Sequence, residues 1–246
     1  MEANLASVSG NVHEALLIER RTIADEIEAY TLRLDPPAPL AFRAGQFVSL
    51  RVGEDRDGSA VLRSYSIASS PDHDRITLIV RHIPGGAAAT WFDRLTVGAR
   101  VRFTGPMGFF VLELAHAGDV VFGATGVGIT PVLPMLDEVL ARKETGRVHV
   151  LWGNRNGKDV FWREELQDRV ASHPRLSVEL FLSREPASEG FSHGRITAPL
   201  LALAPSLTRP TFYLVGSGAM IKDVKTGLVE RGIDRKRQVR NEAFFD

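Results

Sequence analysis

The chain has 246 residues, with thirty basic residues against thirty acidic ones and no cysteine. The length fits two domains of roughly 100–140 residues, and the zero net charge argues against a general nucleic-acid binder, which normally carries a basic surplus. Because cysteine is missing, the chain has no disulfide, thiol nucleophile, zinc–thiolate site or cysteine-held iron–sulfur cluster, and we expect no metal site. Redox chemistry would therefore need an organic cofactor.

The sequence carries no signal for membrane insertion or export. No apolar run approaches the roughly 18–20 residues of a membrane span, and Met1–Gly10 lacks the basic and apolar regions of a signal peptide. We therefore expect a cytoplasmic protein with neither a membrane nor a nucleic acid as partner.

Short β-rich segments separated by turn residues fill the first half of the sequence. One helix is predicted among them, at Ala87–Leu95, and an acidic loop at residues 53–58. Many short strands with frequent turns indicate an antiparallel barrel or sandwich. The predicted strands are Glu14–Glu19, Glu28–Leu34, Gln46–Val52, Ser64–Ala68, Arg75–Arg81 and Val101–Thr104.

The second half alternates apolar strands with helices, which is typical of a parallel sheet covered on both faces. The predicted strands are Asp119–Gly123, Val148–Trp152, Ser177–Leu182 and Thr211–Val215, and the predicted helices are Pro131–Arg142, Arg163–Ala171, Thr197–Ala202 and Met220–Arg231. We therefore expect an N-terminal antiparallel β-barrel domain, residues 1–111, followed by an α/β nucleotide-binding domain, residues 112–246.

A glycine-rich turn, Gly123–Pro131, joins the first strand of the second half to its helix. Backbone N–H groups and the helix dipole attract a phosphate at such a turn. The spacing is not the GxGxxG dinucleotide fingerprint, and a plain strand-to-helix turn without ligand explains the pattern equally well.

Three arginines follow predicted strand ends in this half. An NAD-binding unit usually has an acidic residue at the end of its second strand for the ribose hydroxyl, but here Arg155 follows that strand and no carboxylate does. Arg184 follows the third strand, and Arg195 comes shortly after it. Singly, each arginine reads as solvated surface. Together they favour the 2′-phosphate of NADPH, held by charge-assisted hydrogen bonds.

The β half carries two further motifs. In Arg63–Ser66, Arg63 and Tyr65 share one side of a strand, which suits a ligand with a phosphate and a flat ring; an ordinary half-buried strand is the alternative. The Gly85-Gly86 pair opens the predicted helix and offers a second amide-rich phosphate site, or a plain helix start with Thr90 near its cap.

These motifs, in this order, resemble the ferredoxin–NADP⁺ reductase superfamily and its bacterial-type ferredoxin/flavodoxin reductases, from about Val12 to Phe245. The matching pieces are Arg63-x-Tyr65-Ser66, Gly85-Gly86, Gly105-Pro106-x-Gly108-Phe109, Gly126-x-Gly128-Ile129-x-Pro131, Gly216-x-x-x-Met220 and Glu242-x-Phe244. The resemblance implies that the barrel binds FAD, through Arg63, Ser64, Tyr65, Ser66, Arg81, Gly85, Gly86, Ala87 and Thr90. It implies that Ser66 lies near flavin N5, with Glu242 as a proton partner and Phe244 as a stacking ring, the three catalytic residues.

The resemblance also implies an NADP site in the α/β domain. Its residues would be Thr125, Gly126, Val127, Gly128, Pro131, Arg155, Ser183, Arg184, Arg195, Gly216 and Met220. Three departures stand out: Val215 replaces the usual cysteine beside the nicotinamide, Val127 replaces a threonine, and Ala89 replaces a serine. The last leaves the diphosphate to backbone amides and slightly weakens the case for FAD over FMN.

The implied function is an FAD-dependent reductase that takes a hydride from NADPH and passes single electrons to a separate carrier such as ferredoxin or flavodoxin. Two alternatives remain within the enzyme class, an NADH-using reductase component of an oxygenase system and a free-flavin reductase. A non-catalytic flavin-binding subunit is a third. The basic segment Arg231–Arg240 would dock an acidic carrier, or is simply a solvated helix end.

Overall fold

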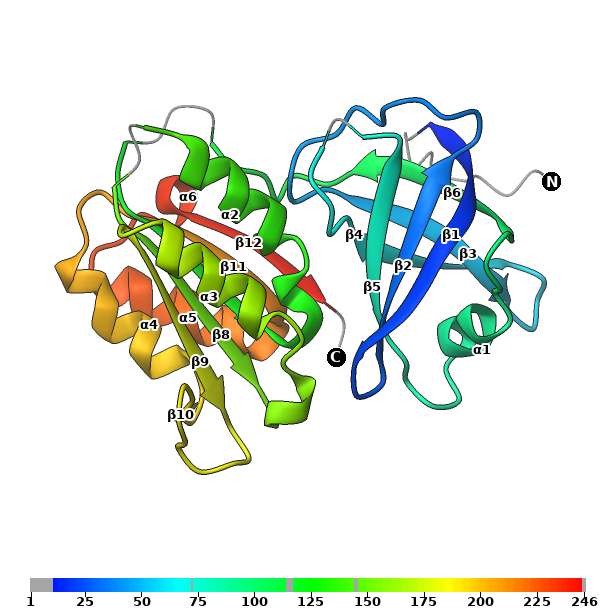
Figure 1. The fold of residues 1–246 in the computed structure, drawn as a ribbon. Helices are drawn as coiled ribbons and strands as arrows, with labels where there is room; N and C mark the ends of the chain where they lie inside the picture. Colours follow the sequence, from blue (N-terminus) through cyan, green and yellow to red (C-terminus); the bar gives the residue numbers. More distant parts are fainter. Residues whose placement is uncertain (1–10, 72, 114–116, 144–145, 245–246) are drawn as a thin grey trace.

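The structure, a computed structural model, describes residues 11–71, 73–113, 117–143 and 146–244. Met1–Gly10, to which the signal-peptide prediction refers, and Phe245, at the end of the family resemblance, lie outside these ranges. Two six-stranded sheets follow each other along the chain, the first antiparallel and the second parallel (Figure 1). The predicted fold class is confirmed, whereas the boundary after residue 111 remains a prediction.

The first sheet has the strand order β4-β3-β6-β1-β2-β5. Its strands are β1 (Val12–Ala24), β2 (Ile27–Leu34), β3 (Phe47–Glu54), β4 (Ala60–Ser66), β5 (Arg75–Arg81) and β6 (Arg100–Met107), with α1 (Ala87–Asp93) between the last two. Apolar residues alternate along its strands and form the barrel core. In β3, for example, Val48, Leu50 and Val52 are buried on one face. An antiparallel bridge between Ile67 and Leu78 joins the two outer strands, so the sheet curls into a barrel.

The second sheet has the order β10-β9-β8-β7-β11-β12. Its strands are β7 (Val120–Thr125), β8 (Val148–Asn154), β9 (Leu176–Leu182), β10 (Ser192–His193), β11 (Thr211–Ser217) and β12 (Val239–Phe244). Its helices are α2 (Val132–Ala141), α3 (Arg163–Ser172), α4 (Thr197–Leu203), α5 (Gly218–Glu230) and the short α6 (Arg235–Gln238), with the 3₁₀ turns η1 (Gly126–Ile129), η2 (Gly157–Asp159) and η3 (Ala204–Ser206).

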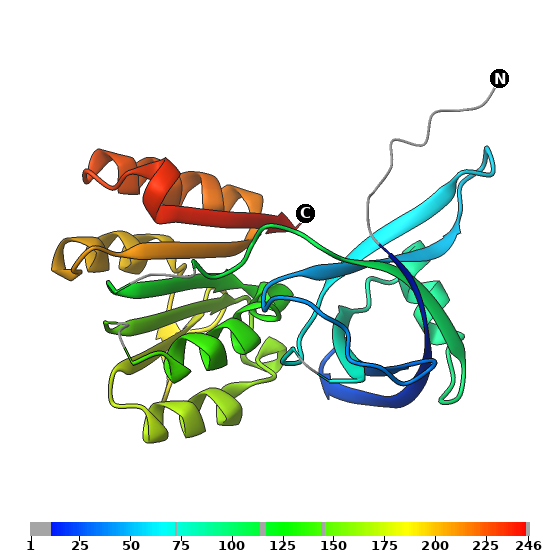
Figure 2. The same ribbon diagram turned by 90° about the horizontal axis from the view of Figure 1, so that it is seen from above.

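Helices cover both faces of this sheet (Figure 2). α2 and α3 pack on one face and α4 and α5 on the other, each over its own apolar cluster. β7, in the middle, is buried on both faces, as expected for a parallel strand. In the part of the chain that the structure describes, no helix is both long and apolar enough to cross a bilayer.

Three sequence-based expectations differ from the structure. β1 runs to Ala24 because its second half pairs with β2. The acidic loop is shorter than predicted, because β3 continues to Glu54 and β4 begins at Ala60, extending the ribbon with exposed side chains. β12 was not predicted at all. Its sequence, VRNEAF, has no apolar run that would indicate a strand. The segment is a strand because its backbone pairs with β11.

The two domains share one continuous apolar seam. Ile27, Ala29 and Ile79 of the barrel belong to the same buried cluster as Ile129 and Val132 of the α/β domain. Gly45 of the barrel also lies close to α2, because an added Cβ there would be 3.0 Å from the Met135 sulfur, besides 1.9 Å from the Phe110 carbonyl oxygen. The seam therefore holds the end of the barrel against the carboxyl edge of the parallel sheet.

We predict that Gly45→Ala destabilises the protein by about 3 kcal/mol or more, because the methyl group collides with the Phe110 backbone and crowds the Met135 side chain of α2 across the seam. Gly58→Ala is the matched control. Gly58 also has a positive φ, of 83°, but an added Cβ meets nothing within 4 Å, so only about 1–2 kcal/mol of backbone strain is expected. Urea unfolding measures both, and equal losses would contradict the close-packed seam.

Candidate functional site

A serine of the barrel and a glutamate of the α/β domain meet at the seam. Ser66, at the end of β4, is buried, and its Oγ donates to Oε1 of Glu242 at 3.5 Å. Burial raises the pKa of Glu242 to about 7, although the Ser66 hydrogen bond opposes the shift. A carboxyl group that changes charge near neutral pH thus lies between the domains. The sequence predicted both residues for one site, and the structure brings them together.

The edge strand β12 delivers Glu242 and Phe244. Glu242 lies opposite Val215 of β11 in the parallel register, and Phe244 lies opposite Ser217. Phe244 is half-buried and packs against the cluster that forms the seam. Arg240, two residues earlier in β12, does not pair with Glu242 but with the Glu113 carboxylate. Among the described residues Glu242 has no cationic partner.

On the barrel side, Tyr65 and Arg63 lie on the same face of β4. The Tyr65 ring meets the Phe92 ring edge-on, with 5.3 Å between centroids, and burial raises the pKa of Tyr65 to about 12. Arg63 is exposed, bonds only the Leu62 carbonyl, and forms no ion pair with a described residue. A braced aromatic ring and an available guanidinium thus lie side by side, next to exposed Ser64.

The predicted diphosphate turn leads into α1. Gly85 has a φ of 76° and is exposed, and the Gly86 N–H donates to the Ile83 carbonyl at 3.0 Å. The Thr90 hydroxyl donates back to the Gly86 carbonyl at 3.2 Å, so its hydrogen is used within the helix. Ala87 is exposed at the start of α1. Arg81 binds Asp159 of η2 at 3.2 Å across the seam, which ties this guanidinium to the partner domain.

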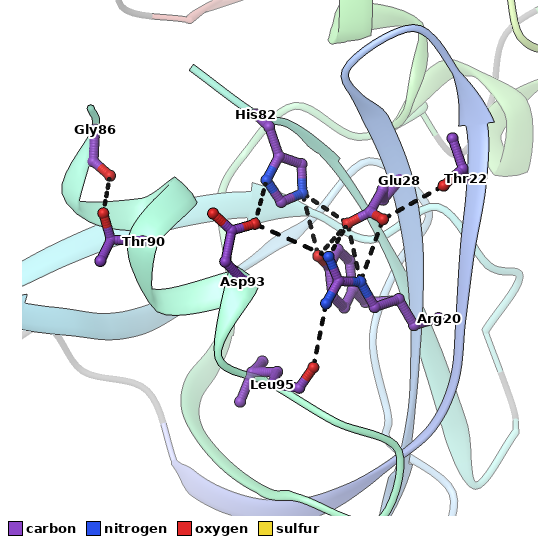
Figure 3. A network of polar contacts seen from close by, with 9 residues as sticks. Arg20, Thr22, Glu28, His82, Gly86, Thr90, Asp93 and Leu95 are labelled. Carbon is purple, nitrogen blue, oxygen red and sulfur yellow. Dashed lines mark hydrogen bonds and ion pairs between the residues drawn. The ribbon is translucent and has the colours of Figure 1, made fainter. Parts of the chain in front are cut away.

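Sequence reasoning missed a polar network beneath this turn (Figure 3). Arg20, Glu28, His82 and Asp93 come from β1, β2, the end of β5 and α1, and they are linked by ion pairs of 2.8 to 3.9 Å. Their separations along the chain follow no local period, so no pattern could have indicated the cluster. In the sequence, each of these charged residues taken alone looks like an ordinary surface residue.

On the α/β side, two glycine turns interlock at the ends of β7 and β11. Gly216 has a φ of 114°, and a Cβ there would lie 2.3 Å from Thr125 Oγ1. That oxygen accepts the Ser217 N–H at 2.8 Å. A Cβ on Gly128 would lie 3.0 Å from the Gly216 Cα. The structure thus brings predicted site residues of the two motifs to one place.

Several predicted site residues in this region are buried or half-buried and pack against the two glycine turns. The Trp152 indole donates to the Gly126 carbonyl at 2.8 Å, Pro131 is buried, and Val127 is half-buried against the seam cluster. The Met220 side chain lies in the core with α5, and its N–H donates to Ser217 Oγ. Met220 and Val215 are both buried, and the expected place of Met220 in the nucleotide site stays a prediction.

The three arginines gather at the carboxyl ends of β8 and β9. The Arg184 N–H donates to the Arg155 carbonyl at 3.0 Å, and the Ser183 N–H and hydroxyl both donate to the Asn154 carbonyl. Gly194, just before Arg195, donates to the Leu182 carbonyl at 2.9 Å. All three guanidiniums are exposed, and none pairs with a carboxylate of the described residues. This edge is where open α/β sheets bind ligands.

The basic segment lies elsewhere. α6 precedes β12, whereas Glu242 and Phe244 lie at that strand's far end, and six strand residues span about 20 Å. Figure 1 shows α6 at the end of the sheet away from the barrel. Arg237 and Arg240 also pair with Asp234 and Glu113. Most of the segment thus lies at the amino end of β12, and its role as a docking surface for an acidic carrier stays a prediction.

Two family models match the chain in order. An oxidoreductase FAD-binding domain matches residues 14–112, and an oxidoreductase NAD-binding domain matches residues 122–226. The solved cytochrome P450 reductase of Amycolatopsis has the same fold, with a TM-score of 0.83 at 28% identity, over 97% of this chain and 72% of that one.

Two relatives align along most of the chain. Ferredoxin–NADP reductase B of Sorangium cellulosum is 31% identical over 231 residues, 91% of this chain and 94% of the relative. The ferredoxin–NAD(P)⁺ reductase component of the naphthalene 1,2-dioxygenase/salicylate 5-hydroxylase systems of Ralstonia is 29% identical, over 90% of this chain and 67% of the relative. With both domain models and a nearly full-length relative above 30% identity, the chain belongs to the ferredoxin–NADP⁺ reductase superfamily of FAD- and NAD(P)-binding oxidoreductases.

Proposed function

We propose that this protein is an NADPH-dependent FAD reductase that delivers single electrons to a separate carrier such as ferredoxin or flavodoxin. The contact between Ser66 and Glu242 carries the proposal, because it joins the predicted flavin strand to the edge of the nucleotide domain. Bound FAD supplies the chemistry: it accepts a hydride from the reduced nicotinamide and releases the electrons one at a time.

The barrel residues fit a flavin dinucleotide. Tyr65, braced by Phe92, offers a ring for the isoalloxazine, and the unpaired Arg63 offers a cation for a phosphate. Gly85 is exposed and has open space where a side chain would be, which leaves room for a ligand close to the backbone of the turn. Ala89 is buried within α1, so no side chain at that position replaces the family's serine, and diphosphate binding depends on the turn and Arg63.

At the reacting edge, Glu242 holds and releases a proton, and Ser66 orients its carboxyl group. The pKa near 7 lets both charge states occur at physiological pH. Phe244 and Val215 keep the surroundings of that carboxyl apolar and limit water. Arg155, Arg184 and Arg195 hold the 2′-phosphate at the carboxyl edge of the sheet, which selects NADPH over NADH.

These 246 residues hold no cysteine and so no cysteine-bound iron–sulfur relay, which supports a separate carrier as the acceptor. The names of the relatives support a ferredoxin-type carrier: one is a ferredoxin–NADP reductase and another a ferredoxin–NAD(P)⁺ reductase component of a dioxygenase system. The latter favours a second candidate function, the reductase component of an oxygenase system. Free flavin as acceptor and a non-catalytic flavin-binding role are weaker candidates, since neither needs Glu242 at the seam.

Turnover with defined partners tests the proposal and separates these candidates. We expect the enzyme to reduce a ferredoxin or a flavodoxin faster with NADPH than with NADH. We also expect this rate to exceed the rate of free-flavin reduction with NADPH or NADH. Preferred use of NADH with a ferredoxin would favour the oxygenase component. Turnover with free flavin alone, or none with any acceptor, would contradict the proposal.

The arginine cluster gives a sharper prediction. Arg184→Ala and Arg195→Ala should each raise the KM for NADPH about ten- to a hundredfold, because each removes a charge-assisted contact to the phosphate, and should leave the KM for NADH nearly unchanged. Arg235→Ala, an exposed arginine at the other edge of the sheet, is the control. An unchanged NADPH-to-NADH preference in both variants would rule out the phosphate site.

The titration of Glu242 gives another. In wild type, the rate of flavin reduction and reoxidation should show an inflection near pH 7, which Glu242→Gln abolishes. Ser66→Ala should move the inflection upward, because the serine hydrogen bond lowers this pKa. Identical pH profiles in wild type and Glu242→Gln would show that this carboxyl takes no part.

The same shift predicts the pH dependence of stability in the flavin-free protein. Because the folded pKa of about 7 lies above the ordinary value of 4.5, Glu242 contributes stability below pH 4.5 that is lost as pH rises through 7. Glu242→Gln should therefore gain in melting temperature relative to wild type between about pH 5 and pH 8. If the difference in melting temperature between wild type and Glu242→Gln stayed the same from pH 5 to pH 8, the raised pKa would be contradicted.

A further inference from the structure

The polar network beneath the diphosphate turn connects four elements of the barrel (Figure 3). Arg20 Nη2 lies 2.9 Å from Glu28 Oε2. His82 lies between two carboxylates, with Nε2 2.8 Å from Glu28 Oε2 and Nδ1 3.3 Å from Asp93 Oδ1. Glu28 and His82 are 15% and 16% exposed, whereas Asp93 is 62% exposed. The centre of the network is therefore shielded and its link to α1 is not.

Hydrogen bonding keeps Glu28 charged. Burial alone would raise the pKa of Glu28, but hydrogen bonds from Arg20 and from the Tyr30 hydroxyl, at 2.5 Å, outweigh it and lower the pKa. Each ring nitrogen of His82 faces a carboxylate oxygen, of Glu28 on one side and of Asp93 on the other. The imidazole thus links β2 to α1.

The network holds the turn and helix at both ends. His82 directly precedes the Ile83–Gly86 turn, Asp93 ends α1, and Arg20 Nη1 donates to the Leu95 carbonyl at 3.3 Å. Between these points lies Phe92, whose ring packs on Tyr30 at 4.6 Å and on Tyr65 at 5.3 Å.

Apolar packing does little for the turn itself. Ile83 is 67% exposed, and a Cβ on Gly85 would meet nothing within 4 Å. A backbone hydrogen bond from His82 to the Glu26 carbonyl, at 2.7 Å, and the His82 side chain hold the start of the turn, while buried Phe92 anchors α1 in the core. Removing the His82 side chain therefore loosens the turn and leaves the helix in place.

We infer that His82 is a positioning residue for the flavin, which through Glu28 and Asp93 holds the turn at residues 83–86 where it receives the FAD diphosphate. The inference rests on the proposed function, because it needs the diphosphate at this turn. His82 itself touches no ligand in this account. Its effect is confined to the phosphate part of FAD, since Phe92, which braces Tyr65, is fully buried and held by ring packing rather than by the network.

Flavin affinity of the full chain, freed of cofactor, tests this. Dissociation constants are measured by fluorescence for FAD and for riboflavin, which has no phosphate. His82→Ala and Asp93→Ala should each weaken FAD about tenfold, the loss expected for one charged hydrogen bond, and riboflavin less than about twofold. The double variant should be no worse than either single one, because the two residues act through one contact.

Controls keep the outcomes distinct. His73→Ala, an exposed imidazole before β5, should change neither affinity. Asp93→Asn, at a mostly exposed position, removes the charge with little risk to folding and should reproduce the FAD-specific loss. Equal losses for both flavins, additive losses, or no loss would overturn the role of His82. A wild type that does not prefer FAD over riboflavin would instead overturn the proposed diphosphate placement.

Discussion

The apolar seam between the domains is the constraint on which the site depends. It is one cluster running from Ile27 and Ile79 of the barrel to Ile129 and Val132 of the α/β domain. Because the seam is closely packed, the end of β4 in the barrel lies directly against the end of β12 in the α/β domain. Ser66 and Glu242 meet for that reason, and a cofactor bound to the barrel would face a nucleotide bound to the sheet.

The seam also determines the electrostatics. A carboxyl group in an apolar contact is costly to ionise, so the pKa of Glu242 rises toward neutrality. Cationic groups stand outside the seam, where water and ligands reach them: Arg63 on the barrel and the arginine cluster at the carboxyl edge of the sheet. Two cations pair across the domains instead, Arg81 with Asp159 and Lys158 with Asp25. The half-buried Glu242 carboxyl thus lies at the seam, and the exposed arginines lie around it.

The sequence predicted the features that have a local signature. Alternation in β3, glycine turns after β7 and β11, and arginines after strand ends all depend on neighbours along the chain, and the structure brings them together. It did not predict β12, whose order comes from pairing with β11, or the Arg20–Glu28–His82–Asp93 network, whose members are far apart in the chain. Met220, matched by motif alone, has its side chain in the core, which no local pattern indicated.

The central claim is that the two domains together transfer a hydride from NADPH to FAD. The most direct measurement is an anaerobic titration of the FAD-loaded protein with NADPH, followed by the visible absorption of the flavin. The account predicts stoichiometric bleaching, reversed when an oxidised ferredoxin or flavodoxin is added. A protein that binds FAD but keeps its oxidised spectrum in excess NADPH, or that cannot be loaded with flavin, would contradict it.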